Sequence, residues 1–175
     1  MFLLVRSRLT AITILCVLLA VPAAALARAP TRKQIADAVR RAERSRYLWA
    51  TFNICNTMRH PNAVGIRAQM PALGFRARMS MRFQVTYLSA KDRRFKPVPG
   101  AARSVALASA SNGLYQAGVT FRFAPNAGLL SSTVSFTWAL GRRSLGQVTR
   151  ATSGGHRDAD AGDPPHFSAG KCMIR

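Results

Sequence analysis

The stretch 78-RMSMRFQVTYL-88 is the clearest guide to the fold, because its apolar and polar residues alternate. The apolar side of this alternation holds Met79, Met81, Phe83, Val85 and Tyr87. A period of two is typical of a β-strand that buries one face and leaves the other in water. The stretch therefore predicts an antiparallel strand with one wet face.

The same alternation returns along the rest of the chain. It is found in 47-YLWATFNIC-55, 63-AVGIRAQM-70, 118-GVTFRFA-124 and 132-STVSFTWAL-140, and weaker strands are expected at 104–108, 148–152 and 167–174. Turn-forming Pro, Gly and Asn residues separate these runs, and no long helical pattern lies between them. The arrangement predicts an all-β fold: a single antiparallel immunoglobulin-like β-sandwich over residues 47–175.

Residues 1–27 have the order of parts found in a secretory signal peptide. Two arginines precede an apolar run at 9–21, and the small-residue motif Ala-Leu-Ala follows at 25–27. This order predicts cleavage before Arg28 and a secreted product, extracellular or associated with the cell wall, with no transmembrane segment after cleavage. The alternative is an uncleaved membrane anchor, because the uncharged run is close to the length that spans a bilayer.

Residues 28–46 form a basic segment with the only helical pattern after the leader. Thr31 and Gln34 have the spacing of a capping box, and Ile35, Val39 and Ala42 fall on one helical face. Two interpretations stay open. The segment is a solvated spacer, which the thin apolar stripe favours, or it is a basic arm that lies on an anionic surface.

Two cysteines, Cys55 and Cys172, remain after the leader. In an exported protein they are expected to form one disulfide, which would close most of the domain into a loop. If Phe52 and Ile54 face the core, however, Cys55 faces the other way in a regular strand. Either a bulge near Asn53 turns Cys55 inward, or Cys55 lies just beyond the end of the strand. We favour the second.

The chain is strongly basic, with 26 Lys and Arg residues against 6 Asp and Glu and a formal charge of +20. This charge predicts attraction to anionic wall polymers, anionic lipid or acidic glycans. The outward positions on the predicted strands offer a basic sheet face formed by Arg67, Arg82, Arg122 and Arg150. The excess of arginine over lysine is also typical of a high-GC genome, so the charge has a compositional explanation as well. No specific nucleic-acid binding is expected, because the aromatic residues lie on the apolar sides of their strands.

The tract 154-GGHRDADAGDPPHFSAGKC-172 concentrates residues that bind metals. The possible ligands are His156, Asp158, Asp160, Asp163 and His166. A calcium loop of the EF-hand type that started at Asp158 would need glycine at the sixth position and glutamate at the twelfth, but Asp163 and Ala169 stand there. A different calcium site and a zinc site are the alternatives. We favour a polar loop that holds no metal or other cofactor, because Gly and Asp-Pro-Pro are typical of turns.

The sequence carries no strong catalytic motif. It has no G-x-S-x-G elbow and no phosphate-binding glycine loop, and Ser153 near His156 is proximity rather than a triad. We therefore predict a protein that is not an enzyme: a secreted binding or structural module of the cell envelope that contacts anionic polymers. A protein–protein adhesion module with incidental charge is one alternative. A metal-dependent enzyme using residues 156–166 is another.

The chain also resembles secreted bacterial immunoglobulin-like proteins. The early FNICNT and the ending GDPPHFSAGKCMIR look like those of uncharacterised exported proteins of high-GC Gram-positive bacteria, which pair such cysteines. The resemblance covers about residues 47–175. It implies the sandwich and the disulfide but no activity, so no functional residues carry over. The chain also lacks the Cys…Trp…Cys order of antibody domains.

Overall fold

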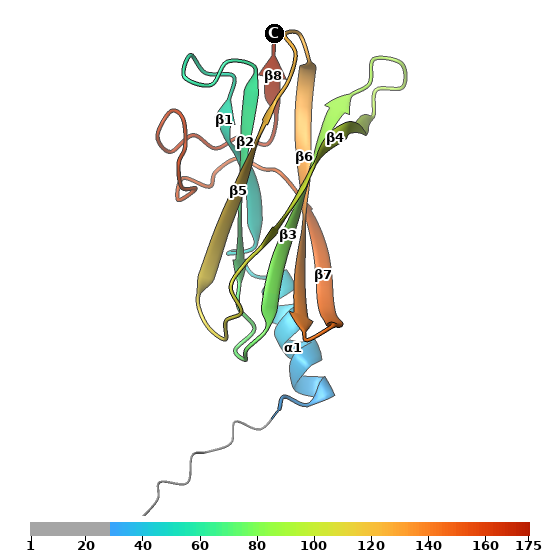
Figure 1. Ribbon diagram of the computed structural model, residues 1–175, viewed down its shortest axis with the longest axis vertical. Coiled ribbons are helices and arrows are strands. Elements are labelled where there is room, and N and C mark those ends of the chain that lie inside the picture. The colour runs from blue at the N-terminus through green and yellow to red at the C-terminus, as the bar shows by residue number, and fades with distance from the viewer. Residues whose placement is uncertain (1–28) are drawn as a thin grey trace, which may run out of the picture.

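A computed structural model describes residues 29–175 as two β-sheets packed face to face, with one helix at an end of the sandwich (Figure 1). The predicted signal peptide, residues 1–27, lies outside the described residues. The elements are α1 (Arg32–Glu43), β1 (Trp49–Cys55), β2 (Ala63–Pro71), β3 (Arg78–Leu88), β4 (Phe95–Ala106), β5 (Leu114–Arg122), β6 (Gly128–Leu140), β7 (Arg143–Ala151) and β8 (Cys172–Ile174). The predicted all-β sandwich is confirmed.

The strands pair in an immunoglobulin-like order. One sheet has the order β1-β2-β5, and the other has the order β4-β3-β6-β7, with the short β8 pairing with the first residues of β6. All of these pairings are antiparallel. In a constant-type immunoglobulin domain the fourth strand joins the sheet of the first two. Here it pairs with β3 instead, which gives the second sheet its extra edge strand.

All three weaker predicted strands have different bounds, and the one expected at 148–152 is the end of the longer β7, which begins at Arg143. The strand expected at 104–108 is the end of the longer β4, which begins at Phe95 and contains Pro97 and Pro99. The prolines argued against a strand at 95–103, because proline cannot donate a backbone hydrogen bond. It is tolerated here because β4 lies at the edge of its sheet. The tract expected at 167–174 is a strand only in β8.

The core forms where the inner faces of the two sheets meet. Met79, Met81, Phe83 and Val85 are fully buried, which confirms the alternation of β3. Tyr87 is 38% exposed instead, because the hairpin of β3 and β4 extends away from the covering sheet there (Figure 1). Across the layers, the buried Trp138 of β6 donates from Nε1 to the Pro71 carbonyl of β2 at 2.9 Å.

Helix α1 packs against the end of the sandwich. Its capping box is formed as predicted, with Thr31 and Gln34 bonding each other's backbone N–H groups. Ala38, Val39 and Ala42 are buried in the core cluster, and the helix lies against β7. The interpretation of this segment as a solvated spacer is therefore wrong. The thin apolar stripe suffices because it meets a strand with a glycine, Gly146, where the helix approaches.

A β-bulge in β1 sets the direction of Cys55. The register with β2 shifts between Phe52 and Ile54, which leaves Asn53 as an extra residue. Beyond the bulge, Cys55 packs on the core side and forms the disulfide with Cys172, with a Cα–Cα distance of 5.6 Å. The predicted disulfide is confirmed. Our preference for a cysteine beyond the strand end is wrong, because Cys55 is the last residue of β1 and the bulge turns it inward.

The docking of α1 predicts the effect of adding one methyl group at Gly146. A Cβ there would overlap the Val39 side chain, so Gly146→Ala should lower the free energy of unfolding by about 1–3 kcal/mol. Val39→Ala removes the overlapping atoms, so the double variant should lose less than the sum of the two single variants. Urea unfolding measures all three. A Gly146→Ala protein as stable as the wild type would show that the helix does not pack there.

The disulfide predicts a large loss of stability when both of its cysteines are replaced. Cys55 and Cys172 are 117 residues apart, so the bridge restricts most of the unfolded chain. Cys55→Ser/Cys172→Ser should lower the free energy of unfolding by about 2–5 kcal/mol. A reducing agent should destabilise the wild type similarly and leave the double variant unchanged. An equal response of both proteins to reduction would contradict the prediction.

Candidate functional site

The tract between β7 and β8 runs along the free edge of β1. The Ser153 amide donates to the Ala50 carbonyl at 2.9 Å, and the Asp163 amide donates to the Asn53 carbonyl at 2.8 Å. Phe52 and Ala169 exchange backbone hydrogen bonds of 2.9 and 3.1 Å. An uncovered edge strand would offer these groups to another chain. The tract therefore completes the sheet on its β1 side.

Polar side chains on the outer face of the three-stranded sheet hold the same tract by its backbone. Asn53 Nδ2 donates to the carbonyls of Asp160 and Ala161 at 2.8 and 2.9 Å. Gln116 donates to the Asp158 carbonyl at 2.9 Å and accepts from the Asp160 amide at 3.1 Å. These bonds fix Asp158 and Asp160 through their main chain. Both residues are exposed to solvent.

Asp163 has a different role from the other two aspartates. It is only 8% exposed, and its carboxylate accepts a hydrogen bond from the Thr57 hydroxyl. Arg59 NH2 lies 3.2 Å from Asp163 Oδ1, and His60 Nε2 lies 3.8 Å from Oδ2. The carboxylate therefore ties the tract to the turn between β1 and β2. This set of partners is basic and hydroxylic, which suits a structural carboxylate better than a metal ligand.

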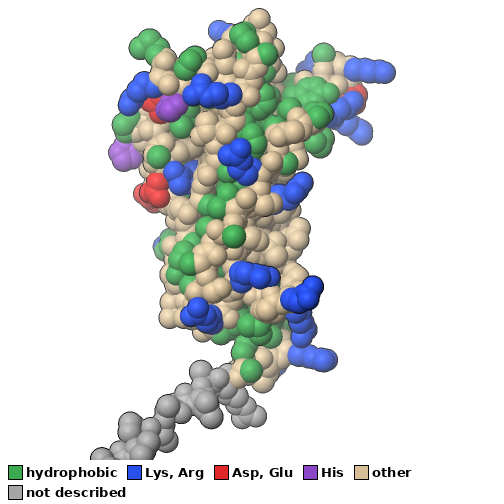
Figure 2. All heavy atoms as spheres, in the orientation of Figure 1, with side chains coloured by type: hydrophobic (Ala, Val, Ile, Leu, Met, Phe, Trp, Pro, Cys, Tyr) green, Lys and Arg blue, Asp and Glu red, His purple; other side chains and the backbone are tan. Residues whose placement is uncertain are grey.

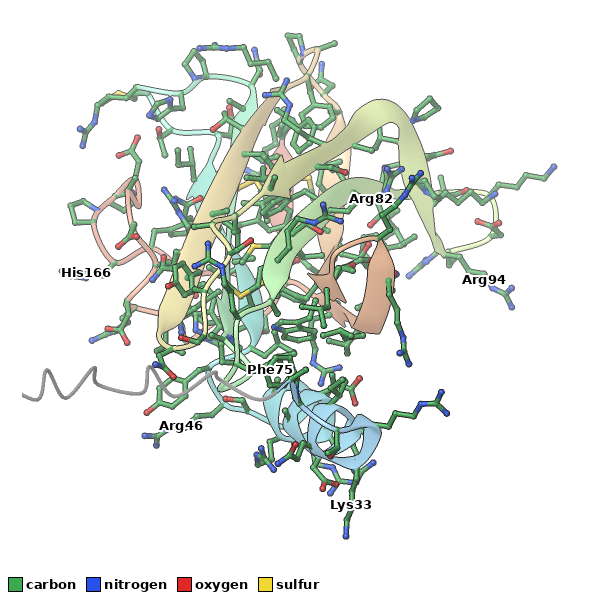
Figure 3. All side chains as sticks on the ribbon, turned by 60° about the horizontal axis from the view of Figure 1, so that its bottom comes forward. Lys33, Arg46, Phe75, Arg82, Arg94 and His166 are labelled. Atoms are coloured by element: carbon green, nitrogen blue, oxygen red, sulfur yellow. A yellow bond between two sulfur atoms is a disulfide. The ribbon has the colours of Figure 1, made fainter. Side chains whose placement is uncertain are left out.

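The five possible metal ligands do not come together. His156 stacks on Trp49, whereas His166 is exposed, points away from the body of the protein, and has its Nδ1 3.2 Å from the Arg157 carbonyl (Figure 3). Within residues 29–175, no group of three or more His, Cys, Asp or Glu side chains is placed to hold a metal ion. Only the residue types suggested a metal site, and the backbone of the tract keeps these side chains apart.

His156 is held in a contact that changes its protonation. Its ring lies 4.8 Å from the Trp49 ring, with 11° between the planes, and Ser153 Oγ lies 2.9 Å from its Nε2. Burial in this contact lowers the pKa of His156 from its ordinary value, and the charge of Asp158 opposes that shift. A lowered pKa favours the neutral ring. A depression of about 410 Å³ opens beside it, lined by Arg46, Tyr47, Trp49, Gln69, Gly155, His156 and Asp158.

The four arginines predicted to share a basic face are divided between the two sheets. Arg67 and Arg122 lie on the outer face of the three-stranded sheet, and Arg82 lies on that of the other sheet. Arg150 stands opposite the buried Val134 of β6 and donates to the Glu43 carbonyl at the end of α1, at 2.6 Å. The prediction of one shared face is wrong, because the strands that carry these residues belong to different layers.

Basic residues are spread over the visible face of the sandwich, with groups of them at both ends (Figure 2). The end that carries α1 also carries the β2–β3 and β6–β7 connections (Figure 1). We call this surface the basic end. Its exposed members are Arg32, Lys33, Arg40, Arg41, Arg44, Arg76, Arg78, Arg142 and Arg143. The sequence did not reveal this grouping, because three separate segments contribute to it.

A second concentration lies on the β3–β4 hairpin at the other end. We call this the basic hairpin, made of residues 87–96. Three of the four lysines in the chain, Lys91, Lys96 and Lys171, lie on it or beside it. Lysine is rare in this arginine-rich sequence, and the short spacing of Lys91 and Lys96 is the sequence signal for this surface.

Neither a protein-family model nor a curated protein sequence matches the chain. Within residues 29–175, no helix combines the length and apolar character needed to cross a membrane.

The surroundings of His156 predict two opposite pKa shifts. Asp158→Asn should lower the pKa further, because it removes the charge that opposes the effect of burial. Trp49→Ala should raise the pKa toward about 6.5, because it returns the ring to water. Titration of the imidazole Cε1 proton by NMR measures both shifts, and Asp160→Asn is the matched control.

The same shift has a consequence for stability. Because the pKa of His156 is lowered in the folded protein, the neutral ring contributes to the free energy of unfolding. This contribution is fully present above about pH 6.5 and is lost as the pH falls through the lowered pKa. A pKa of His156 that did not change in either variant would contradict this account of the contact.

Proposed function

We propose that the protein is a secreted, non-catalytic module of the cell envelope that binds anionic polymers through the basic end. The observation that carries the proposal is the uncompensated charge of this surface. Of its basic residues, Arg40 is ion-paired with a carboxylate, that of Asp37. The other described carboxylate ion pairs of Lys or Arg are those of Arg59 and Lys96, and neither lies at this end.

The arrangement of the basic end suits a polymer better than a small ligand. Its guanidinium groups lie on α1 and on the β2–β3 and β6–β7 connections, and no carboxylate besides those of Asp37 and Glu43 is on the helix. Arginine presents a planar fork of donors that matches phosphate and carboxylate oxygens. A chain of anionic groups can contact several such forks at once, and each contact strengthens the others through proximity.

Two features support a location outside the cytoplasm. The disulfide between Cys55 and Cys172 is of a kind that forms and persists in oxidising compartments. The leader-like pattern of residues 1–27 agrees with export. Export would place the basic end among the phosphate- and carboxylate-bearing polymers of an envelope.

The proposal predicts salt-dependent binding to a purified glycerol-phosphate wall polymer. Binding should weaken by at least about tenfold between about 0.1 M and 1 M NaCl, because the screening length falls from about 10 Å to about 3 Å. Arg142→Glu/Arg143→Glu, at the β6–β7 turn, should lose most of the binding at the lower salt concentration. Co-sedimentation or calorimetry measures it.

The matched control changes the net charge equally elsewhere. Arg103→Glu/Arg157→Glu reverses two exposed arginines that lie outside the basic end, and it should retain most of the binding. Equal losses in both variants would show that net charge alone is responsible. Binding that ignores salt would overturn the proposal in favour of protein–protein adhesion with incidental charge.

A further inference from the structure

The tip of the basic hairpin carries cations that form no ion pair with a carboxylate within residues 29–175. Residues 91–94 read Lys-Asp-Arg-Arg, so three of the four are basic, and Lys91, Arg93 and Arg94 are all exposed. Figure 3 shows Arg94 pointing away from the body of the sandwich. The turn is tight, with the Ser89 amide donating to the Arg94 carbonyl at 2.9 Å. The cations are therefore presented on a short, defined projection.

The one acid of this turn is engaged within the hairpin. Asp92 lies 2.7 Å from Lys96 Nζ. Hydrogen bonds from Lys96 and then Ser89 lower the pKa of Asp92, which keeps it charged and bound to these partners. Asp92 thus shapes the turn and neutralises Lys96. The charges of Lys91, Arg93 and Arg94 remain available to an outside partner.

Exposed aromatic side chains stand next to these cations. Tyr87 is 38% exposed and Phe95 is 37% exposed. Tyr87 pairs with Lys96 and Leu88 pairs with Phe95, so the two aromatic rings lie on opposite faces of the hairpin. Lys171 extends from the β8 side and places its Nζ 5.6 Å from the centre of the Phe95 ring. The hairpin therefore combines apolar rings and cations on both of its faces.

We propose that the basic hairpin lies with its Phe95 face on the surface of an anionic phospholipid bilayer, so that Phe95 reaches the boundary with the acyl chains and the cations contact the headgroups. A soluble polyanion would need the cations only. The exposed Phe95 ring gains free energy when an apolar phase lies directly beneath the charges, which is the situation at a bilayer interface. The inference rests on the same excess of positive charge as the proposed function, but on residues at the other end of the sandwich.

Phe95→Trp makes this docking visible in the full chain. The natural tryptophans, Trp49 and Trp138, are 7% and 0% exposed, so they provide a constant background. Adding vesicles of phosphatidylcholine with about a quarter phosphatidylglycerol should shift the new emission to the blue, and brominated acyl chains should quench it. Vesicles of phosphatidylcholine alone should produce a much weaker response. The blue shift reports the surroundings of residue 95, so binding of residues 1–28 to the vesicles does not by itself produce it.

Charge reversal at the tip supplies the second arm. Lys91→Glu/Arg94→Glu in the reporter protein should weaken partitioning by at least about tenfold, since each basic residue near an anionic surface contributes roughly 1 kcal/mol. Arg103→Glu/Arg157→Glu, with the same change in net charge, should leave the blue shift in place. Phe95→Ala should reduce sedimentation of the full chain with anionic vesicles relative to the wild type.

The outcomes separate this inference from the proposed function. No blue shift with anionic vesicles, or an equal shift after Lys91→Glu/Arg94→Glu, overturns lipid docking. Loss of wall-polymer binding in that same variant, without any lipid response, would assign the hairpin to the polymer and also overturn it. Failure of Arg142→Glu/Arg143→Glu to affect polymer binding would refute the proposed function alone, because those residues lie at the opposite end.

Discussion

One extra residue in an edge strand, Asn53, determines how the two layers and the acidic tract are joined. Before it, Phe52 points into the core, and after it Cys55 does so as well, which would be impossible in a regular strand. The turned cysteine reaches β8, which belongs to the opposite sheet, so the bulge allows a covalent link between layers. The amide of Asn53 also holds the carbonyls of the tract. Gly65 faces this bulge, where a Cβ would lie 2.7 Å from Asn53 Oδ1.

Elements with a regular alternation or helical spacing of apolar residues could be predicted from the sequence. Features that depend on an interruption of that pattern could not. Alternation located the core of β3, and the spacing of Thr31 and Gln34 located the start of α1. The bulge at Asn53 interrupts alternation by a single residue, so the sequence left two routes for Cys55 open. Arg150 was assigned an outward position by the same rule, but it stands at an edge where it reaches a helix carbonyl.

Contacts between distant segments account for what the sequence did not show at the candidate sites. The aspartates were possible ligands because carboxylates bind metals. In the structure Asn53 and Gln116 bond the backbone carbonyls of Asp160 and Asp158, and such backbone contacts cannot be read from residue types. Lys171 meets the ring of Phe95 only after folding. Three of the six acids, Asp37, Asp92 and Asp163, bind neighbouring basic groups. The scarcity of acid therefore shapes local structure and leaves both ends of the sandwich positive.

The position of the disulfide also decides how the protein would carry mechanical load. It joins the first strand to the last, with 117 residues of separation between the two cysteines. A pull applied between the two ends of the chain passes from β1 to β8 through the sulfur atoms, and the strands in between are outside the path of the force. At about 3.5 Å per extended residue, roughly 400 Å of chain is withheld from stretching. The strands between the two cysteines, β2 to β7, would be shielded from the tension until the covalent bond itself was reduced.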